Sequence, residues 1–268
     1  MTIFAHPDDE TFGLAGTLRR ATSAGRAVAV VCATRGEAGQ IADPSLATQE
    51  TLGAVREREL RKAMEQVGVR DVRFLDYHDG RLPEVDHEEA VEKITRHIRA
   101  FRPDVVVTFP ANGGYGHVDH IAIHHLTLDA LRAAADPARS HENGLAPHRI
   151  RKLYFVAFSR ERMVKMQEEA AREGRDYRPG GDAATIPFEE MGVPEAEITT
   201  RIILSDDEFG AKLRAVHSHR TQLRADGPWI TLAPEALRAF LGVEAFQLVP
   251  ELSDRQYTAP EEDLFAGL

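Results

Sequence analysis

Two short stretches of the chain gather acids and histidines, and the first lies almost at the start. Residues 5–10 read AHPDDE and follow a short apolar run. Charged side chains close to a core need a partner such as a metal ion. Because Asp8 and Asp9 are consecutive, their side chains point in different directions, so one can bind a metal with His6 while the other serves as a base. The alternative is that one acid only caps the following helix.

The second stretch, ANGGYGHVDH at residues 111–120, follows another apolar run and enters a helix. His117 and His120 are three residues apart, so they share one face of the helix start, where two imidazoles can reach one centre. Asp119 lies between them. Together the two stretches predict a hydrolytic metal site, and nitrogen ligands favour zinc or iron over magnesium.

The elements that would position these stretches alternate between strands and helices. Apolar patterning predicts strands at residues 2–5, 27–33, 72–75, 105–109 and 152–158, with a last strong strand at 197–204. Helices are predicted from the AHPDDE stretch to Gly25, and at residues 51–67, 88–101, 161–173 and 205–222, with a loop, lid or oligomer contact at 174–195. The run AVAVVCA indicates a strand buried on both faces. The pattern therefore predicts an α/β fold with a parallel sheet.

The turns after the predicted strands supply further candidates. Residues 34–39, TRGEAG, form one such turn and lack GxGxxG, which weakens a dinucleotide interpretation. Asp79 lies in the next turn as a candidate ligand contact, although Asp before Gly is common in turns. Arg56 falls on the apolar stripe of its helix, which leaves open an ion pair with Glu59, snorkelling at the end of the stripe, or donation to a ligand.

Length and composition restrict the classes of function. The chain has 268 residues, a formal net charge of −10 and one cysteine, Cys32, in an apolar run. We expect one domain with an appended segment and no internal disulfide. Nucleic acid is a poor partner without a basic cluster, and no stretch reaches the ~20 apolar residues of a membrane span. No secretory signal precedes the first strand, so we expect a cytoplasmic protein.

The two stretches together resemble the LmbE-like, or PIG-L, family of zinc-dependent N-acetylglucosaminyl deacetylases. The resemblance rests on AHPDDE at 5–10 and GHVDH at 116–120, with support from TRGEAG at 34–39, RxxEL at 56–60, DG at 79–80 and KxxAxxxHxTQ at 212–222. It implies a single domain with a Rossmann-like three-layer sandwich, in which about residues 1–135 form the metal-binding core and about 150–268 shape the substrate pocket. The first strand is shorter than usual in the family, which suggests a trimmed start.

The resemblance also implies a role for each matching residue. The metal ligands would be His6, Asp9 and His120, and Asp8 would be the general base. His117 would stabilise the oxyanion or donate a proton to the leaving amine, and Asp119 would orient it. Tyr115 would assist near the scissile carbonyl, and Arg56 and Asp79 would contact sugar hydroxyls. The implied cofactor is Zn²⁺, with Fe²⁺ as the alternative. A water held by such an ion has its pKa lowered from about 15.7 to roughly 7, and Asp8 would take its proton as it attacks the amide.

The expected partner is a small amino-sugar substrate, an N-acetylglucosaminyl conjugate that yields acetate and a free amine. A related sugar-thiol conjugate is one alternative. A metal-dependent phosphoesterase is another, because acids at strand ends also hold Mg²⁺. A nucleotide-binding module or a degenerate family member is the non-enzymatic alternative, and a homo-oligomer is compatible with the sequence.

Overall fold

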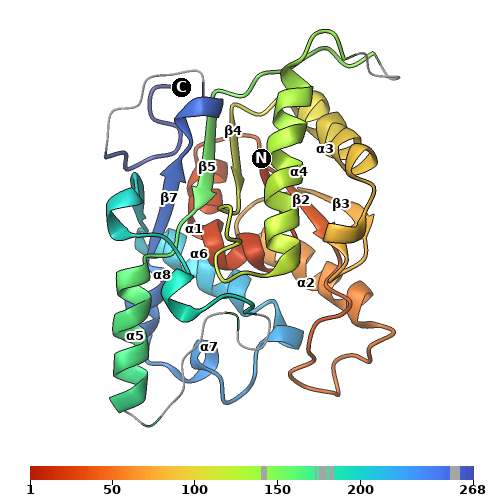
Figure 1. Cartoon of the computed structure of the whole chain (residues 1–268). Helices are drawn as coiled ribbons and strands as arrows, with labels where there is room; N and C mark the ends of the chain where they lie inside the picture. The colour runs from red at the N-terminus through yellow and green to blue at the C-terminus, as the bar shows by residue number, and fades with distance from the viewer. Residues whose placement is uncertain (140–143, 173, 175–179, 181–183, 254–259) are drawn as a thin grey trace. The chain divides into compact units, whose positions relative to one another are not determined.

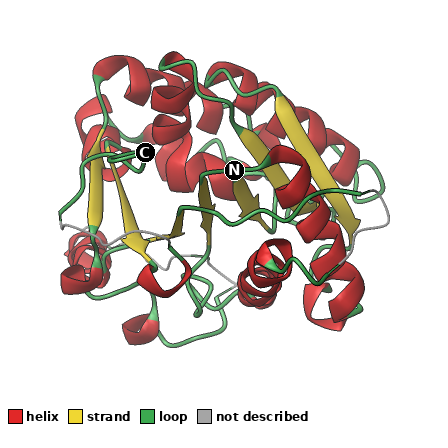
Figure 2. Ribbon diagram, turned by 90° about the horizontal axis from the view of Figure 1, so that it is seen from above, coloured by secondary structure: helices red, strands yellow, loops and turns green. Residues whose placement is uncertain are grey.

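The computed structural model describes residues 1–139, 144–172, 174, 180, 184–253 and 260–268. It divides into two compact units, which we call unit 1 (Met1–Arg81 with Ile202–Glu244) and unit 2 (Leu82–Arg201 with Ala245–Leu268). The strands belong to a seven-stranded, mostly parallel sheet, and helices flank it (Figures 1 and 2). The predicted α/β fold class is therefore confirmed.

Unit 1 begins with three parallel strands in the order β3-β2-β1. Its strands are β1 (Thr2–Phe4), β2 (Ala29–Thr34) and β3 (Asp71–Tyr77), and its helices are α1 (Asp9–Ser23), α2 (Leu52–Gln66), α6 (Asp206–Val216), α7 (Pro228–Thr231) and α8 (Pro234–Leu241). In the register, Ile3 pairs with Val31 and Val31 with Arg73. All six residues of β2 are buried, as its continuous apolar sequence predicts.

Helix α6 packs against α1 and α2. It begins at a capping box, in which the Ser205 side chain accepts from the Glu208 amide and the Glu208 carboxylate accepts from the Ser205 amide. The neighbouring acids Asp206 and Asp207 lie in its first turn, where negative charge is favourable. The same helix ends at Val216, earlier than predicted, and a 3₁₀ turn follows at Arg220–Gln222.

Unit 2 contains the parallel strands β4 (Val105–Thr108) and β5 (Lys152–Val156) and the helices α3 (His87–Phe101), α4 (Val118–Ala135) and α5 (Arg160–Arg172). Helices α3 and α4 lie side by side (Figure 1). The buried guanidinium of Arg99 on α3 donates to the carbonyls of Ala133 and Ala134. It thereby satisfies carbonyl groups that the C-terminal turn of α4 leaves without helical partners.

The division of the chain into two units falls within two strands, β6 (Thr200–Ile203) and β7 (Val243–Leu248). The prediction of a last strong strand at residues 197–204 is wrong in two respects. Residues Glu195–Glu197 form a 3₁₀ turn before β6, and β7 follows as a further strand, antiparallel to β5. Only alternate residues of β7 are buried, so its sequence lacks the continuous apolar run that marks the parallel strands.

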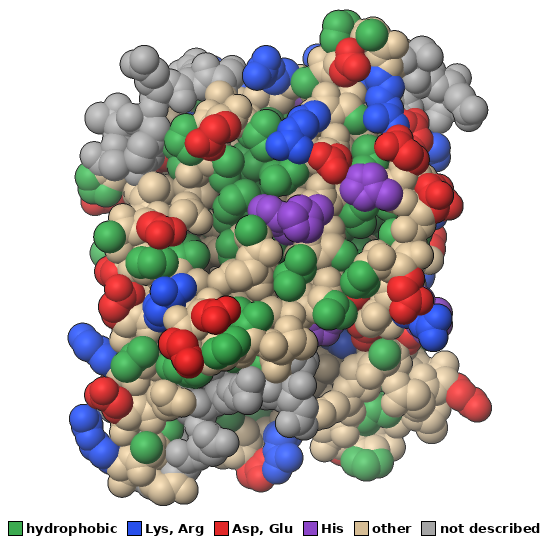
Figure 3. All heavy atoms as spheres, in the orientation of Figure 1, with side chains coloured by type: hydrophobic (Ala, Val, Ile, Leu, Met, Phe, Trp, Pro, Cys, Tyr) green, Lys and Arg blue, Asp and Glu red, His purple; other side chains and the backbone are tan. Residues whose placement is uncertain are grey.

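The segment predicted as a loop at residues 174–195 lies partly outside the described residues. In its described part, the amide N–H of Thr185 donates to the carbonyl of Tyr115, and that of Gly192 donates to the carbonyl of Gly114. No described helix is both long and apolar enough to span a bilayer. On the face shown in Figure 3, acidic and basic side chains are interspersed.

Candidate functional site

The AHPDDE turn, residues 5–10, connects β1 to α1 in unit 1. Asp8 occupies the N-cap position of α1 with φ 145°, a positive value that is unusual for a residue other than glycine. Its side chain makes no capping hydrogen bond, so the interpretation of Asp8 as a helix cap is wrong. Backbone strain of this kind costs of order 1–3 kcal/mol and is concentrated at functional sites.

Asp9 is the first residue of α1, and its carboxylate lies against His6. Its Oδ2 accepts a hydrogen bond of 2.7 Å from the His6 amide and lies 3.6 Å from His6 Nδ1. Two ligands on a tetrahedral zinc ion, each at about 2.1 Å, are about 3.4 Å apart. The two side chains therefore fit a shared divalent cation.

Asp79 contacts the other nitrogen of the same imidazole. Its Oδ1 lies 2.9 Å from His6 Nε2, and its Oδ2 accepts from the Ala38 amide at 3.1 Å. Burial raises the pKa of Asp79, but the hydrogen bond and charge of His6, the charge of Arg56 and the Ala38 amide outweigh it and bring the pKa to about 2. The structure thus has Asp79 in contact with a predicted metal ligand, and its predicted contact to a sugar stays a prediction.

Arg56 is buried, with 4% of the residue exposed. Its guanidinium donates to the carbonyls of Gly36 (2.9 Å) and Pro7 (3.1 Å) and to Oδ2 of Asp8 (3.1 Å). The suggested ion pair with Glu59 is wrong, because the Glu59 carboxylate accepts instead from the amide and hydroxyl of Thr221. Arg56 therefore anchors one oxygen of the Asp8 carboxylate.

The TRGEAG turn at residues 34–39 makes room for this guanidinium. Gly36 has φ +66°, and a Cβ there would lie 2.2 Å from Arg56 Nη1; a Cβ on Gly39 would lie 2.6 Å from the same atom. The hydroxyl of Thr34 donates to the Ala5 carbonyl and accepts from the Gly36 amide. The AHPDDE, TRGEAG and RxxEL motifs are thus parts of one arrangement in unit 1.

The second stretch, residues 111–120, leads into α4 in unit 2, and His117 is the N-cap of this helix. Its Nδ1 accepts a 3.1 Å hydrogen bond from the amide N–H of Asp119. A neutral imidazole has one donor and one acceptor nitrogen, so Nε2 of His117 carries the hydrogen. The contact between the two residues is made by the backbone of Asp119, and the role of Asp119 in orienting His117 stays a prediction.

His120 has the opposite arrangement. Its Nδ1 lies 3.0 Å from the Gly113 carbonyl, which can only accept, so Nδ1 carries the hydrogen and Nε2 presents a lone pair. A backbone carbonyl at the nitrogen that does not bind the metal is a common partner of a metal-bound histidine. The ring stacks on Phe109 with centroids 3.8 Å apart. His117 and His120 offer ring nitrogens within 4.8 Å of each other.

Two other predicted residues lie in the same part of unit 2. The carboxylate of Asp119 is buried, and its Oδ1 accepts from the Leu82 amide at 3.0 Å. The Tyr115 ring stands edge-on to that of His120, with centroids 5.0 Å apart. Asn112, which the sequence did not single out, donates from Nδ2 to the carbonyl of Gly192 and accepts from the Gly114 amide. The available signal for Asn112 was a polar side chain between an apolar strand and a pair of glycines.

Sequence reasoning also missed a buried polar chain in unit 1. Nε2 of His219 lies 2.9 Å from the Thr11 hydroxyl, which donates to Oε1 of Glu10 at 2.7 Å. Burial, with nearby Arg56, lowers the pKa of His219 to about 3. Burial, together with Asp8 and Asp9, raises the pKa of Glu10 to about 8. The HxTQ part of the 212–222 motif was the signal for this chain.

Comparisons with known proteins agree on one family. The PIG-L family, described as GlcNAc-PI de-N-acetylase, matches residues 1–131. A 1D-myo-inositol 2-acetamido-2-deoxy-alpha-D-glucopyranoside deacetylase of Streptomyces griseus is 33% identical over 291 residues, which cover 100% of this chain and 88% of the relative. A protein of the same name from Kineococcus radiotolerans is 33% identical over 306 residues, with 99% and 82% covered.

A solved structure shares the fold. The N,N'-diacetylchitobiose deacetylase from Pyrococcus horikoshii matches with a TM-score of 0.66 at 21% identity, and the match covers 94% of this chain and 83% of that one. Both are α/β structures with a mostly parallel sheet flanked by helices. From its sequence relatives over the full length, the chain belongs to the PIG-L family.

Proposed function

We propose that the protein is a metal-dependent N-deacetylase that hydrolyses the acetamide of a small N-acetylglucosaminyl conjugate. One observation carries this proposal: the consecutive acids of the AHPDDE turn have different partners. Asp9 faces His6 Nδ1 at 3.6 Å, whereas Asp8 is held by Arg56 at 3.1 Å. A hydrolytic metal site needs this separation of a ligand from a base.

The metal would be held by His6, Asp9 and His120, with Zn²⁺ favoured and Fe²⁺ as the alternative. The lone pair on His120 Nε2 and the spacing of His6 from Asp9 support this assignment. The ion supplies a water of lowered pKa and a positive charge beside the carbonyl oxygen. Imidazole ligands disfavour the Mg²⁺ that a phosphoesterase would use.

Asp8 would accept the proton of the attacking water, and Arg56 would fix the Asp8 carboxylate in place. For Arg56 this replaces the sugar contact that the sequence suggests, because its Nη groups already donate to protein oxygens. His117, with hydrogen on Nε2, would donate a hydrogen bond to the developing oxyanion, and the proton that Asp8 takes from the water would pass to the leaving amine. Such a donor typically contributes about 3 kcal/mol. Tyr115 would assist beside the carbonyl.

The substrate class follows from the relatives, whose names describe deacetylation of an N-acetylglucosamine joined to inositol. We propose this kind of conjugate as the first substrate, and a sugar-thiol conjugate as the next. Hydrolysis would release acetate and leave a free amino sugar. The cytoplasmic location, the possible homo-oligomer and the single-domain organisation stay predictions of the sequence.

The test is acetate release from N-acetylglucosaminyl-inositol and from simpler N-acetylglucosaminides, with the metal-free protein reloaded with Zn²⁺ or Fe²⁺. We expect activity that a chelator removes and added metal restores. Asp8→Asn should keep its metal and lose about 10²–10⁴-fold in kcat. Absence of acetate release from every substrate with either metal would refute the proposal, and full activity of metal-loaded Asp8→Asn would refute the assignment of the base.

A further inference from the structure

The imidazole of His6 has a carboxylate at each of its two nitrogens. Nε2 lies 2.9 Å from Oδ1 of Asp79, whereas Nδ1 lies 3.6 Å from Oδ2 of Asp9. His6 and Asp79 are both buried. An ionised carboxylate only accepts, so the shorter contact assigns a hydrogen of His6 to Nε2. Nδ1 is then the nitrogen that faces Asp9.

Asp79 is itself fixed by the TRGEAG turn. Its Oδ2 accepts from the Ala38 amide at 3.1 Å, and its own amide donates to Oε1 of Glu37 at 3.0 Å. Both carboxylate oxygens therefore have protein partners, and the residue is 9% exposed. A carboxylate held in this way has little freedom to follow a substrate hydroxyl.

We propose that Asp79 is a positioning residue that holds His6 in the orientation and tautomer in which Nδ1, together with Asp9, accepts a divalent cation. This inference rests on the proposed function and deepens its metal site. A carboxylate behind a ligating histidine fixes the ring and raises its basicity, and removing such a partner typically weakens metal binding by about 10–100-fold. Asp79 thus acts through His6 and not on the sugar.

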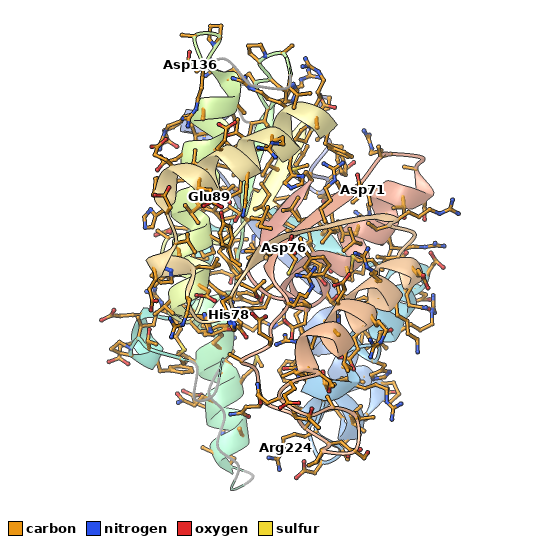
Figure 4. All side chains as sticks on the ribbon, turned by 90° about the vertical axis from the view of Figure 1, so that its right-hand side faces the viewer. Asp71, Asp76, His78, Glu89, Asp136 and Arg224 are labelled. Carbon is orange, nitrogen blue, oxygen red and sulfur yellow. The ribbon has the colours of Figure 1, made fainter. Side chains whose placement is uncertain are left out.

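Asp76 provides a matched control in the same segment. Figure 4 labels it near the carboxyl end of β3, and its exposed side chain pairs with Arg35. Its φ of 62° is a conformation that asparagine tolerates, so Asp76→Asn removes the same charge without disturbing His6.

The first experiment titrates the metal-free protein with Zn²⁺ against a chromophoric chelator. We expect Asp79→Ala to raise the Kd for zinc by about 10–100-fold, Asp79→Asn to fall between it and wild type, and Asp76→Asn to bind as wild type. The Tm of each metal-free variant verifies folding. Unchanged zinc affinity in Asp79→Ala would overturn the inference, and a raised KM at that unchanged affinity would identify a sugar contact instead.

The second experiment determines where hydrogen lies on the His6 ring in the absence of metal and substrate. A long-range ¹H–¹⁵N NMR spectrum of the metal-free protein, assigned by the signal lost in His6→Gln, should show hydrogen on Nε2 of His6. Its proton should lie downfield in wild type and Asp76→Asn and move upfield in Asp79→Ala. Hydrogen on Nδ1 of His6 and none on Nε2 in wild type would overturn the inference even if the protein is a deacetylase. The expected NMR and zinc results without acetate release would refute the proposed function alone.

Discussion

His117 and His120 lie with ring centroids 4.8 Å apart, yet their Nδ1 atoms make hydrogen bonds of opposite sense. Nδ1 of His117 accepts from the Asp119 amide, and Nδ1 of His120 faces the carbonyl of Gly113. Nε2 is consequently a donor on His117 and a lone pair on His120. The hydrogen on Nε2 of His117 suits its proposed role as a donor, and the lone pair on Nε2 of His120 suits its proposed role as a metal ligand.

This difference predicts separable losses. His120→Ala should lose its metal, whereas His117→Ala should retain it and lose about 10²–10³-fold in kcat, as when one oxyanion donor is removed. Metal content by atomic emission and kcat on the same samples provide the measurement. His125→Ala, exposed on the same helix, is the control and should change neither. A His117→Ala protein as poor in metal as His120→Ala would contradict the assignment.

The Arg56 cradle can be tested at Gly36. Gly36→Ala introduces a Cβ 2.2 Å from Nη1 of Arg56 at φ +66°. Gly25→Ala imposes a similar backbone strain, at φ +74°, with no atom within 4 Å. We expect Gly25→Ala to lower the free energy of unfolding by about 1–2 kcal/mol, and Gly36→Ala to lower it by about 1–3 kcal/mol more.

Only Gly36→Ala should also reduce kcat, because the displaced guanidinium holds Asp8. Urea unfolding and kcat of the two variants, measured side by side, test both parts. Equal loss of stability in the two would show that the backbone and not the close approach explains the glycine.

Lys212 and Glu244 form a buried ion pair in unit 1, with Nζ 2.7 Å from Oε1. Glu244 also accepts from the amides of Gly16 and Thr17. Lys212→Met should lower the free energy of unfolding by about 3–5 kcal/mol, because it leaves Glu244 buried without its counter-charge. Lys212→Met combined with Glu244→Gln should lose less.

The control for this ion pair is Arg224→Ala. Arg224 pairs with Asp226 at the surface (Figure 4), so its loss should leave the urea midpoint unchanged. If Lys212→Met were as stable as Arg224→Ala, the buried pair would have no part in stabilising unit 1.

His219 predicts how stability changes with pH. Burial keeps its pKa at about 3 in the folded protein, below the value of 6.5 for a free histidine. As the pH falls below 6.5, only the unfolded chain takes up a proton on this imidazole. The contribution of His219 to the free energy of unfolding therefore decreases by up to about 1.4 kcal/mol per pH unit. Glu10 acts in the opposite sense, because its pKa is raised to about 8 and its contribution falls as pH rises from 4.5.

The two opposed contributions are separated by comparing variants. Between about pH 7 and about pH 5.5, the metal-free His219→Gln protein should lose less stability in urea unfolding than wild type does. His217 provides the control, because it is exposed and its amide donates to the carbonyl of Leu213 at the end of α6. The stability of His217→Gln should change with pH as that of wild type does. Parallel curves for His219→Gln and wild type would show that this imidazole titrates normally.

Much of the framework was predictable because local sequence determined it. The continuous apolar residues of β2 predicted a buried strand, and the histidine spacing at the start of α4 predicted that both rings share one face. Motif spacing also identified His6, Asp8 and Asp9 as a group. Their individual roles as ligand and base stay predictions.

The contacts that were not predictable join segments far apart in sequence. Two of the three partners of Arg56 are the backbone carbonyls of Gly36 and Pro7, which carry no side-chain signal. Lys212 pairs with Glu244, and no periodicity connects the two. Strand β7 was missed because its residues are buried only alternately. Backbone acceptors and long-range ion pairs require the fold before they can be recognised.

The positive φ of Asp8 has a practical consequence for anyone who engineers this protein. Glycine adopts such a conformation without strain, so a screen that selects only heat resistance would favour glycine at position 8. Such a variant would lack the proposed base, so kcat has to be measured in every round of selection.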